Sequence, residues 1–325
     1  MPMAKSAIMF PVQCTSDDDF YDIWDRAFED KTYEGTNRYI SDDIDSTLTP
    51  HTILKICQKI PLSKRPIFVF DEFDRITDND AKERMAETIK LLSDVSPNTT
   101  IVLVGIADTI QDLLDHHLSV QRSVRQIELP RMNGGEIKDV LVKRLNLLEM
   151  TISDSAVENI IDIAKGMPGY AQLLGLYSAK GAIFRKVTNI IDFDVFHSIS
   201  KCLVDAGSTI KEMYADAVQS THSNSLYESV LLACALTKQD DFGRFSASDV
   251  IAPLATTLGR EVKIQDFNRH LVKFTKDERG PVLKRKGAKG NLKYTFIEPM
   301  VQSFVLMQGI KDNAVQFNFK DQNPN

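Results

Sequence analysis

Several features that mark other classes of protein are missing from this 325-residue sequence. It has no uninterrupted apolar stretch long enough to span a membrane, and its first residues lack the apolar run of a secretory signal. The four cysteines lie far apart without metal-like spacing, and the six histidines form no H-x-x-x-H pair. We therefore expect a cytoplasmic protein with reduced thiols and no membrane partner.

A further absence concerns phosphate binding. The sequence contains no G-x-x-x-x-G-K-[ST] loop, the motif whose backbone amides and lysine cradle nucleotide phosphates. The bulk composition, 43% hydrophobic and 26% charged, is ordinary for a globular protein. The length predicts roughly two or three domains, each able to bury its own core.

Charge is distributed unevenly along the chain. Residues 260–293 contain eleven Lys/Arg against four Asp/Glu, a net charge of +7, although the whole chain has a net charge of −6. The remaining residues therefore carry −13. This asymmetry indicates that the C-terminal part meets an anionic surface, and the alternative is a solvated charged face.

The most informative segment is an apolar run that ends in two acids. Ile67-Phe68-Val69-Phe70 is followed at once by Asp71 and Glu72. Such a run predicts a strand buried on both faces, as in a parallel sheet covered by helices. Ligands bind at the carboxyl ends of such strands, and carboxylates there suit Mg²⁺ and the activation of water. The alternative is a strand that ends in solvated acids.

Strands and helices alternate in the first part of the chain, which predicts an α/β fold with a parallel sheet. The other expected strands are Ala7–Cys14, Thr100–Gly105 and Arg125–Leu129. The expected helices are Ser16–Phe28, Pro50–Ile60, Asp80–Ser93 and Thr109–His117. We place this α/β core at residues 1–132.

From residue 133 the pattern is helical, and we expect a helical domain at 133–220. Its helices are predicted at Glu136–Glu149, Ser153–Lys165, Tyr170–Lys186 and Phe193–Gln219. Residues 221–310 then read as three helices followed by a β-hairpin, which is the order of a winged helix, and 311–325 as a tail. The helices are predicted at Leu226–Leu236, Ala247–Leu258 and Ile264–Phe274, and the hairpin strands at Val282–Arg285 and Tyr294–Ile297.

The order of these motifs resembles the AAA+ ATPases, over about Ile8 to Ile310. It is most similar to the initiator-like (origin-recognition) branch, which joins a P-loop NTPase core, a helical lid and a C-terminal winged helix. Phe70-Asp71-Glu72 resembles the end of the Walker B strand, and Val104-Gly105-Ile106-Ala107-Asp108 resembles the sensor-1 strand. The resemblance implies ATP and Mg²⁺ as cofactors, with Asp71 holding the metal ion, Glu72 acting on the attacking water and Asp108 sensing the γ-phosphate. Asp108 stands where a neutral residue is commoner, and it could instead cap a helix.

Three further residues take roles from the same resemblance. Arg122 lies where the family has its arginine finger, although it could equally form a surface salt bridge. Pro168, in the turn Gly166-Met167-Pro168-Gly169, resembles the lid residue near the adenine, and it could also simply end a helix. Gln172 stands near the position of the sensor-2 arginine, so sensing by charge is not expected there.

In that family the P-loop precedes a strand like Ala7–Cys14. The resemblance therefore implies a core that lacks the Walker A strand and its loop within this sequence, with a gap in the sheet. Nucleotide is expected to bind weakly or not at all. A longer parent protein, another chain that fills the gap and a rearranged core are all compatible with this pattern, and we favour the first.

The basic C-terminal segment predicts duplex DNA as a partner. The expected contact residues are Lys263, Arg269, Lys273, Lys284, Arg285, Lys286 and Lys289. They fall on the third helix and on the hairpin, which in a winged helix approach the groove and the phosphates. Self-association or contact with another protein is the competing interpretation, because winged helices serve both roles.

Three functional hypotheses follow. The first is an AAA+ ATPase that couples nucleotide state to a DNA-binding winged helix, with little or no turnover from this sequence alone. The second is a STAND-like regulatory switch gated by nucleotide. The third is a non-enzymatic DNA-binding or scaffold protein with a relic ATPase core.

Overall fold

The computed structural model describes residues 7–45, 47–61, 64–96, 98–106, 120, 122–220, 225–288, 290–315, 317 and 319. The chain divides into two compact units, Met1–Glu128 (unit 1) and Leu129–Asn325 (unit 2). The domains expected at 133–220 and 221–310 both fall within unit 2. None of the helices in the described ranges has the length and hydropathy needed to cross a bilayer.

Unit 1 contains a three-stranded parallel sheet in the order β1-β2-β3. Its strands are β1 (Ala7–Gln13), β2 (Arg65–Asp71) and β3 (Thr100–Leu103). Phe10 lies opposite Phe68, and Phe70 lies opposite Leu103. The α/β fold with a parallel sheet is therefore confirmed.

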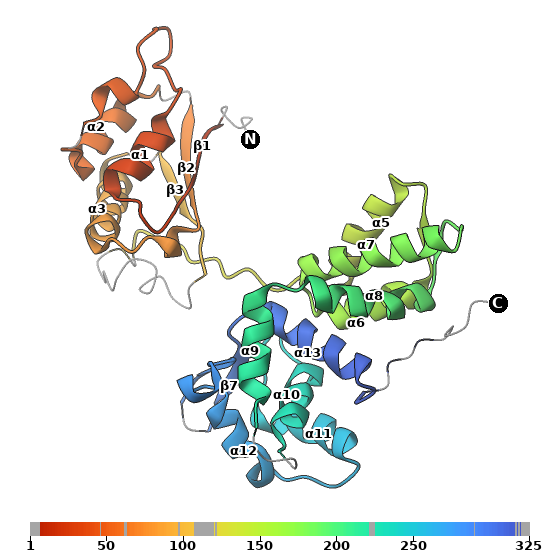
Figure 1. Ribbon diagram of the computed structural model, residues 1–325. Coiled ribbons are helices and arrows are strands. Elements are labelled where there is room, and N and C mark those ends of the chain that lie inside the picture. Colours follow the sequence, from red (N-terminus) through yellow and green to blue (C-terminus); the bar gives the residue numbers. More distant parts are fainter. Residues whose placement is uncertain are drawn as a thin grey trace, which may run out of the picture. The chain divides into compact units, whose positions relative to one another are not determined.

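Three helices cover one face of this sheet (Figure 1). They are α1 (Phe20–Phe28), α2 (Pro50–Lys59) and α3 (Asn79–Val95). Trp24 of α1 is fully buried, and its ring packs edge-on against Phe68 and Phe70 of β2. This aromatic cluster joins the sheet to its helical layer, because large rings bury much apolar area at once.

The prediction that β2 is buried on both faces was wrong. Phe68 and Phe70 are buried, but Ile67 and Val69 on the opposite face are only half-buried. In the neighbouring strands Met9 and Val102 are exposed. Period-two burial of this kind marks a sheet packed on one side, and a short apolar run cannot by itself reveal which faces are covered.

Two other expectations for unit 1 also need correction. Residues 125–129 form no strand, and Ile127 is 73% exposed. The three strands are contiguous, so the sheet shows no gap between strands among the described residues. Helix α1 begins at Phe20 instead of Ser16, because Asp19 and Asp22 form a capping box there. The helix expected at 109–117 lies outside the described residues.

The first part of unit 2 is a group of five helices with a small two-stranded parallel sheet. The helices are α5 (Gly134–Asn146), α6 (Asp154–Ala164), α7 (Pro168–Phe184), α8 (Asp192–Asp205) and α9 (Ser208–Val218). The strands are β4 (Thr151–Ile152) and β5 (Asn189–Ile190). The single helix expected at 193–219 is two helices that are interrupted at Ala206 and Gly207.

The second part of unit 2 contains helices and an antiparallel hairpin. The helices are α10 (Tyr227–Leu236), α11 (Ile251–Leu258) with a 3₁₀ turn before it (Ala247–Val250), α12 (Ile264–Lys273) and α13 (Pro299–Lys311). The hairpin strands are β6 (Leu283–Lys286) and β7 (Lys293–Phe296). Phe245 adds a bridge to Tyr294 of β7. Helix α13 contacts α6, α8, α9 and α10, and it thereby ties the two parts of unit 2 into one core.

Candidate functional site

Two carboxylates stand at the carboxyl edge of the unit 1 sheet, as the sequence predicts. Asp71 is the last residue of β2, and Glu72 follows it in a left-handed conformation (φ 54°). The Cys14 N–H donates to the Asp71 carbonyl at 2.8 Å, and the Phe73 N–H donates to the Val104 carbonyl at 2.9 Å. These bonds hold the ends of all three strands together, so the acids lie on the rim where ligands bind in parallel sheets.

The Glu72 carboxylate is engaged by a neighbouring cation. Arg75 Nη1 lies 2.6 Å from Glu72 Oε2, and both side chains are solvent-exposed. The hydrogen bond from Arg75, with a further one from Gln13, lowers the pKa of Glu72. Glu72 is therefore an anion at neutral pH, and its Oε2 atom is engaged by Arg75.

The donor set at this rim suits a magnesium ion only in part. Carboxylate oxygens are the ligands that Mg²⁺ prefers, and Asp71 is exposed beside Glu72. Among the described residues, however, no group of three or more His, Cys, Asp or Glu side chains is placed to hold a metal ion. An ion here would retain most of its water, and a bound phosphate would have to supply further ligands.

Of the other residues predicted for nucleotide chemistry, Arg122 is described in the same unit as these acids. Arg122 is exposed in unit 1, and none of the described hydrogen bonds or ion pairs joins it to Asp71 or Glu72. Asp108 lies outside the described residues. Pro168 is the first residue of α7 and Gln172 is half-buried one turn later, and both belong to unit 2.

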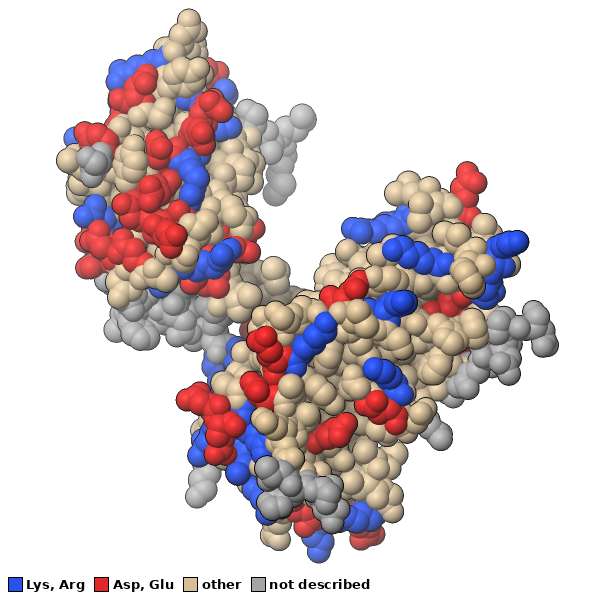
Figure 2. All heavy atoms as spheres, viewed as in Figure 1, with Lys and Arg blue, Asp and Glu red and all other residues tan. Residues whose placement is uncertain are grey.

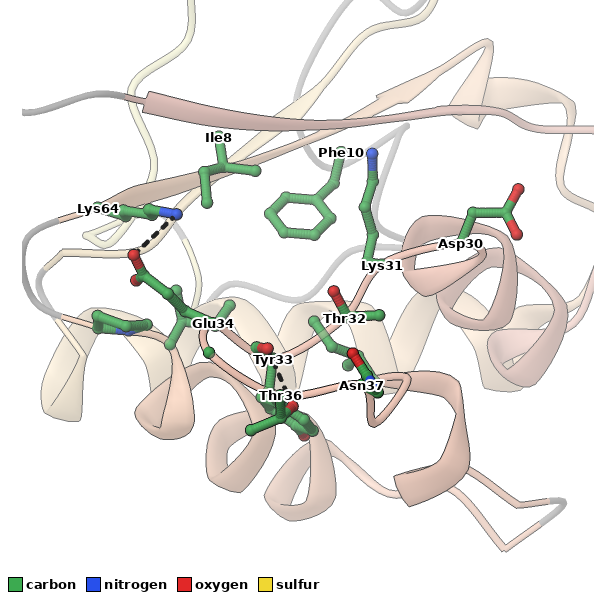
Figure 3. A pocket seen from close by; sticks show the side chains of 14 residues that line it. Ile8, Phe10, Asp30, Lys31, Thr32, Tyr33, Glu34, Thr36, Asn37 and Lys64 are labelled. Atoms are coloured by element: carbon green, nitrogen blue, oxygen red, sulfur yellow. Dashed lines mark hydrogen bonds and ion pairs between the residues drawn. The ribbon is translucent and has the colours of Figure 1, made fainter.

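A cavity of about 520 Å³ lies elsewhere in unit 1 (Figure 3). Ile8 and Phe10 of β1 point into it, opposite the loop that carries Thr32, Tyr33 and Thr36. Lys64 Nζ lies 3.4 Å from Glu34 Oε1 at one end. Its lining residues come from the amino-terminal half of β1 and from residues 30–40 and 60–64. They do not include Asp71 or Glu72, so this cavity is separate from the acidic rim.

Unit 2 presents a surface with exposed Lys and Arg side chains on α12 and the β6–β7 hairpin. Figure 2 shows Lys and Arg beside Asp and Glu side chains in this region. On α12, Phe267, His270 and Leu271 are buried, which turns Arg269 to the solvent. Lys263 stands exposed immediately before the helix. The burial pattern thus fixes which face of α12 is available to a partner.

The hairpin continues this surface. Leu283 and Phe296 anchor it in the core, whereas Arg285 and Lys286 are exposed. Arg285 lies opposite Tyr294, and Lys286 lies opposite Lys293. Beyond β6 the chain turns at Gly287 (φ 115°), where a Cβ atom would stand 2.2 Å from the Asn291 carbonyl oxygen, so this tight turn requires glycine.

The remaining predicted cations differ from these in their surroundings. Lys273 Nζ lies 3.5 Å from a Glu278 carboxylate oxygen. A hydrogen bond with Tyr227, together with the Glu278 charge, raises the pKa of Lys273. Lys284 is half-buried, and Lys289 lies outside the described residues. The exposed cationic surface is therefore defined by Lys263, Arg269, Arg285 and Lys286.

A half-buried arginine links the two parts of unit 2. Arg131 Nη1 donates to Gln239 Oε1 at 2.9 Å and to Gln302 Oε1 at 2.5 Å. The Arg131 N–H donates to the Asp241 carbonyl, and the Met132 N–H donates to the Gly166 carbonyl. Burial lowers the pKa of Arg131 to about 10, against the opposing effect of the Asp240 charge. The segment that enters unit 2 is thus held between the helices α6–α7 and the hairpin-containing part.

Sequence inspection does not identify Arg131 as special. Its partners lie 108 and 171 residues away, and neither glutamine belongs to a recognisable motif. Gly166 and Gly243, the two glycines next to it, are equally inconspicuous, although a Cβ atom at Gly243 would approach the guanidinium carbon to 2.3 Å. Only the folded chain shows that these residues form one contact.

Comparisons with known proteins give structural likenesses only. Neither a protein-family model nor a curated protein matches the sequence. The chain is similar to Cdc6p from Pyrobaculum aerophilum (15% identity, TM-score 0.44, 95% of this chain and 81% of that one). It is also similar to the Aeropyrum pernix ORC2 protein in ADPNP–ADP complexes (11%, 0.48, 95% and 79%) and to the A. pernix ORC1 protein in complex with DNA (11%, 0.42, 95% and 80%).

Proposed function

We propose that this chain is a DNA-binding protein of the AAA+ ATPase class in which residues 221–310 form a winged helix. The observation that carries this proposal is the exposed cationic surface of Lys263, Arg269, Arg285 and Lys286 on α12 and the hairpin. Residues 221–310 have the order of elements of a winged helix: α10, the bridge at Phe245, α11, α12 and the β6–β7 hairpin. Residues 1–132 then serve as the AAA+ core and 133–220 as the lid.

The arrangement suits duplex DNA for a physical reason. The major groove accepts one α-helix, and α12 turns a polar face with Gln265, Asn268 and Arg269 to the solvent. Arg285 and Lys286 then reach phosphates beside the groove. The core of the hairpin, with Tyr294 and Phe296 buried, holds these cations at a fixed distance from α12.

The experiment compares charge-reversal variants of the full-length chain in a fluorescence anisotropy titration with labelled duplex. Arg285→Glu combined with Lys286→Glu should weaken binding by at least about a hundredfold, because two attractive phosphate contacts become repulsive. The matched control is Lys55→Glu with Lys201→Glu, which reverses two exposed charges on α2 and α8. Equal losses in both double variants would show that the effect depends on net charge and would reject this surface.

A second candidate function concerns nucleotide. The paired acids at the rim of the sheet support a site for ATP and Mg²⁺, with Asp71 holding the ion through water and Glu72 polarising the attacking water. In this proposal Asp108 contacts the γ-phosphate, Arg122 acts as a finger, and Pro168 and Gln172 lie near the base. Because the sequence contains no phosphate loop, binding should be weak and turnover negligible.

Calorimetry with ATP and Mg²⁺ tests this second candidate. The candidate would be supported by a heat of nucleotide binding that is lost in the Asp71→Asn variant and retained in the Asp94→Asn variant, which changes an exposed residue as the control. DNA binding that does not respond to nucleotide would instead favour a DNA-binding protein with a relic core. Nucleotide-dependent assembly together with tight ADP retention would favour a STAND-like switch.

A further inference from the structure

Two turns of unit 2 form an apolar tip on the first group of helices. The strands β4 and β5 are parallel neighbours, so the turns that precede them lie side by side, and the Thr151 N–H donates to the Thr188 carbonyl at 2.9 Å. The first turn carries Leu147 and Leu148, and the second follows Ile183 and Phe184 at the end of α7. These apolar side chains therefore gather at one end of the group.

The exposure of these side chains is extreme for their type. Phe184 is 89% exposed, Leu147 84%, Leu148 63% and Ile183 61%. Side chains that line a groove are partly shielded by its walls, whereas these project into solvent from the turn before β4 and from the end of α7. Four large apolar side chains at one end of the group form a patch that isolated surface apolar residues do not produce, and such patches mark interaction surfaces.

Basic side chains surround the tip. Lys143 and Arg144 occupy the last turn of α5, Lys180 lies one turn before Phe184 on α7, and Lys186 follows Phe184 in the second turn. Glu149 is the acid within these two turns. Figure 2 shows Lys and Arg side chains among uncharged ones over α5 and α7, with an Asp or Glu side chain at the upper end of this region.

We infer that this tip binds the surface of an anionic lipid bilayer. Protruding apolar side chains can enter the boundary between headgroups and acyl chains, and cations beside them are attracted by anionic headgroups. Long lysine side chains suit this position, because their stems lie along apolar surface while the ammonium stays in water. A bilayer with anionic headgroups offers both an apolar layer and negative charge, which matches exposed apolar side chains bordered by Lys143, Arg144 and Lys186. The inference is independent of the proposed DNA surface, because its residues lie on α5, α7 and the turns beside β4 and β5.

Vesicle co-sedimentation with the full-length chain tests the inference. We expect binding to vesicles that contain phosphatidylglycerol and little binding to phosphatidylcholine alone. Leu147→Ser combined with Phe184→Ser should weaken binding to the anionic vesicles by about tenfold or more. The control Val204→Ser removes an exposed apolar side chain from α8 and should leave binding unchanged. Circular dichroism of each variant confirms folding, which exposed positions should not disturb.

A second readout separates insertion from simple charge attraction. The sequence has one tryptophan, Trp24, and it is fully buried in unit 1. In Phe184→Trp the added indole should shift its emission to the blue with anionic vesicles, and Arg285→Glu with Lys286→Glu in that background should preserve the shift. Absence of a shift, equal binding by the serine double variant, or loss of self-association in that variant without lipid would each overturn the inference. The last result would assign the tip to a second copy of the chain.

Discussion

Arg131 Nη1 donates to Gln302 Oε1 at 2.5 Å across the junction between the two parts of unit 2. Gln302 lies in the first turn of α13 and in turn donates to the Ala235 carbonyl at the end of α10. Ser303 adds a bond from α13 to the Ala164 carbonyl of α6. Through these contacts, the residue that leads the chain into unit 2 is connected to α13, α10 and α6.

Removal of the Arg131 guanidinium should destabilise unit 2 selectively. Arg131→Ala leaves the Oε1 atoms of Gln239 and Gln302 without this donor in a buried site, at a cost of about 2–4 kcal/mol. Trp24 reports on unit 1 alone, so its fluorescence transition in urea should be unchanged while the transition in circular dichroism shifts to lower urea. Arg122→Ala, at an exposed position, is the control, and an equal shift in both variants would contradict the account.

Two glycines with the same backbone conformation should respond differently to alanine. A Cβ atom added at Gly243 (φ 75°) would stand 2.3 Å from the Arg131 guanidinium, whereas one added at Gly259 (φ 62°) would have no atom within 4 Å. Gly259→Ala should cost about 1 kcal/mol from backbone strain alone. Gly243→Ala should cost roughly 2 kcal/mol more, because it also displaces Arg131. Urea unfolding followed by circular dichroism measures the loss of stability in both variants. Similar losses would show that Arg131 moves away from the added Cβ atom at no cost in free energy.

Unit 2 should lose stability in mild acid through His270. Burial, with the nearby charges of Arg269, Lys273 and Arg279, lowers the pKa of His270 below its ordinary 6.5. The folded state therefore disfavours the protonated form. The contribution of neutral His270 to the stability of unit 2 is complete above pH 6.5. It falls as the pH drops from that value through the pKa that His270 has in the folded state.

The measurement is the urea midpoint of unit 2 between neutral pH and pH about 5. His270→Gln should flatten the pH dependence while retaining a polar group next to Tyr227, whose ring packs edge-on against the imidazole. Exposed His197→Gln is the control and should leave the pH dependence in place. A wild-type midpoint that rises in acid would show that the sign of the shift is wrong.

The sequence identified local structure where a short-range cause acts. Thr49 and Pro50 begin α2 as predicted, because a side-chain cap and a fixed φ act within one turn. Ile67 to Phe70 formed the central strand, and Asp71 and Glu72 lie on its rim. The sequence did not reveal that residues 125–129 are exposed, or that the second face of β2 is only half-buried. The exposure of both depends on which other strands and helices are present.

The candidate sites show the same contrast. The exposed faces of α12 and the hairpin follow from their apolar periodicity, so Arg269 and Arg285 could be predicted. Lys273 could not be separated from them, because its approach to Tyr227 and Glu278 depends on tertiary packing. The apolar tip was missed, since Leu147 and Phe184 look like core residues until the parallel pairing of β4 and β5 places their turns together.

The salt dependence of duplex binding tests the central claim most directly. With full-length chain and labelled duplex, the logarithm of the association constant should fall linearly with the logarithm of salt concentration, with a slope between about −3.5 and −5.5 for four to six phosphate contacts. Arg269→Ala should reduce the magnitude of that slope by about one. Absence of duplex binding at low salt, or a slope near zero that Arg269→Ala leaves unchanged, would contradict the assignment of this surface to DNA.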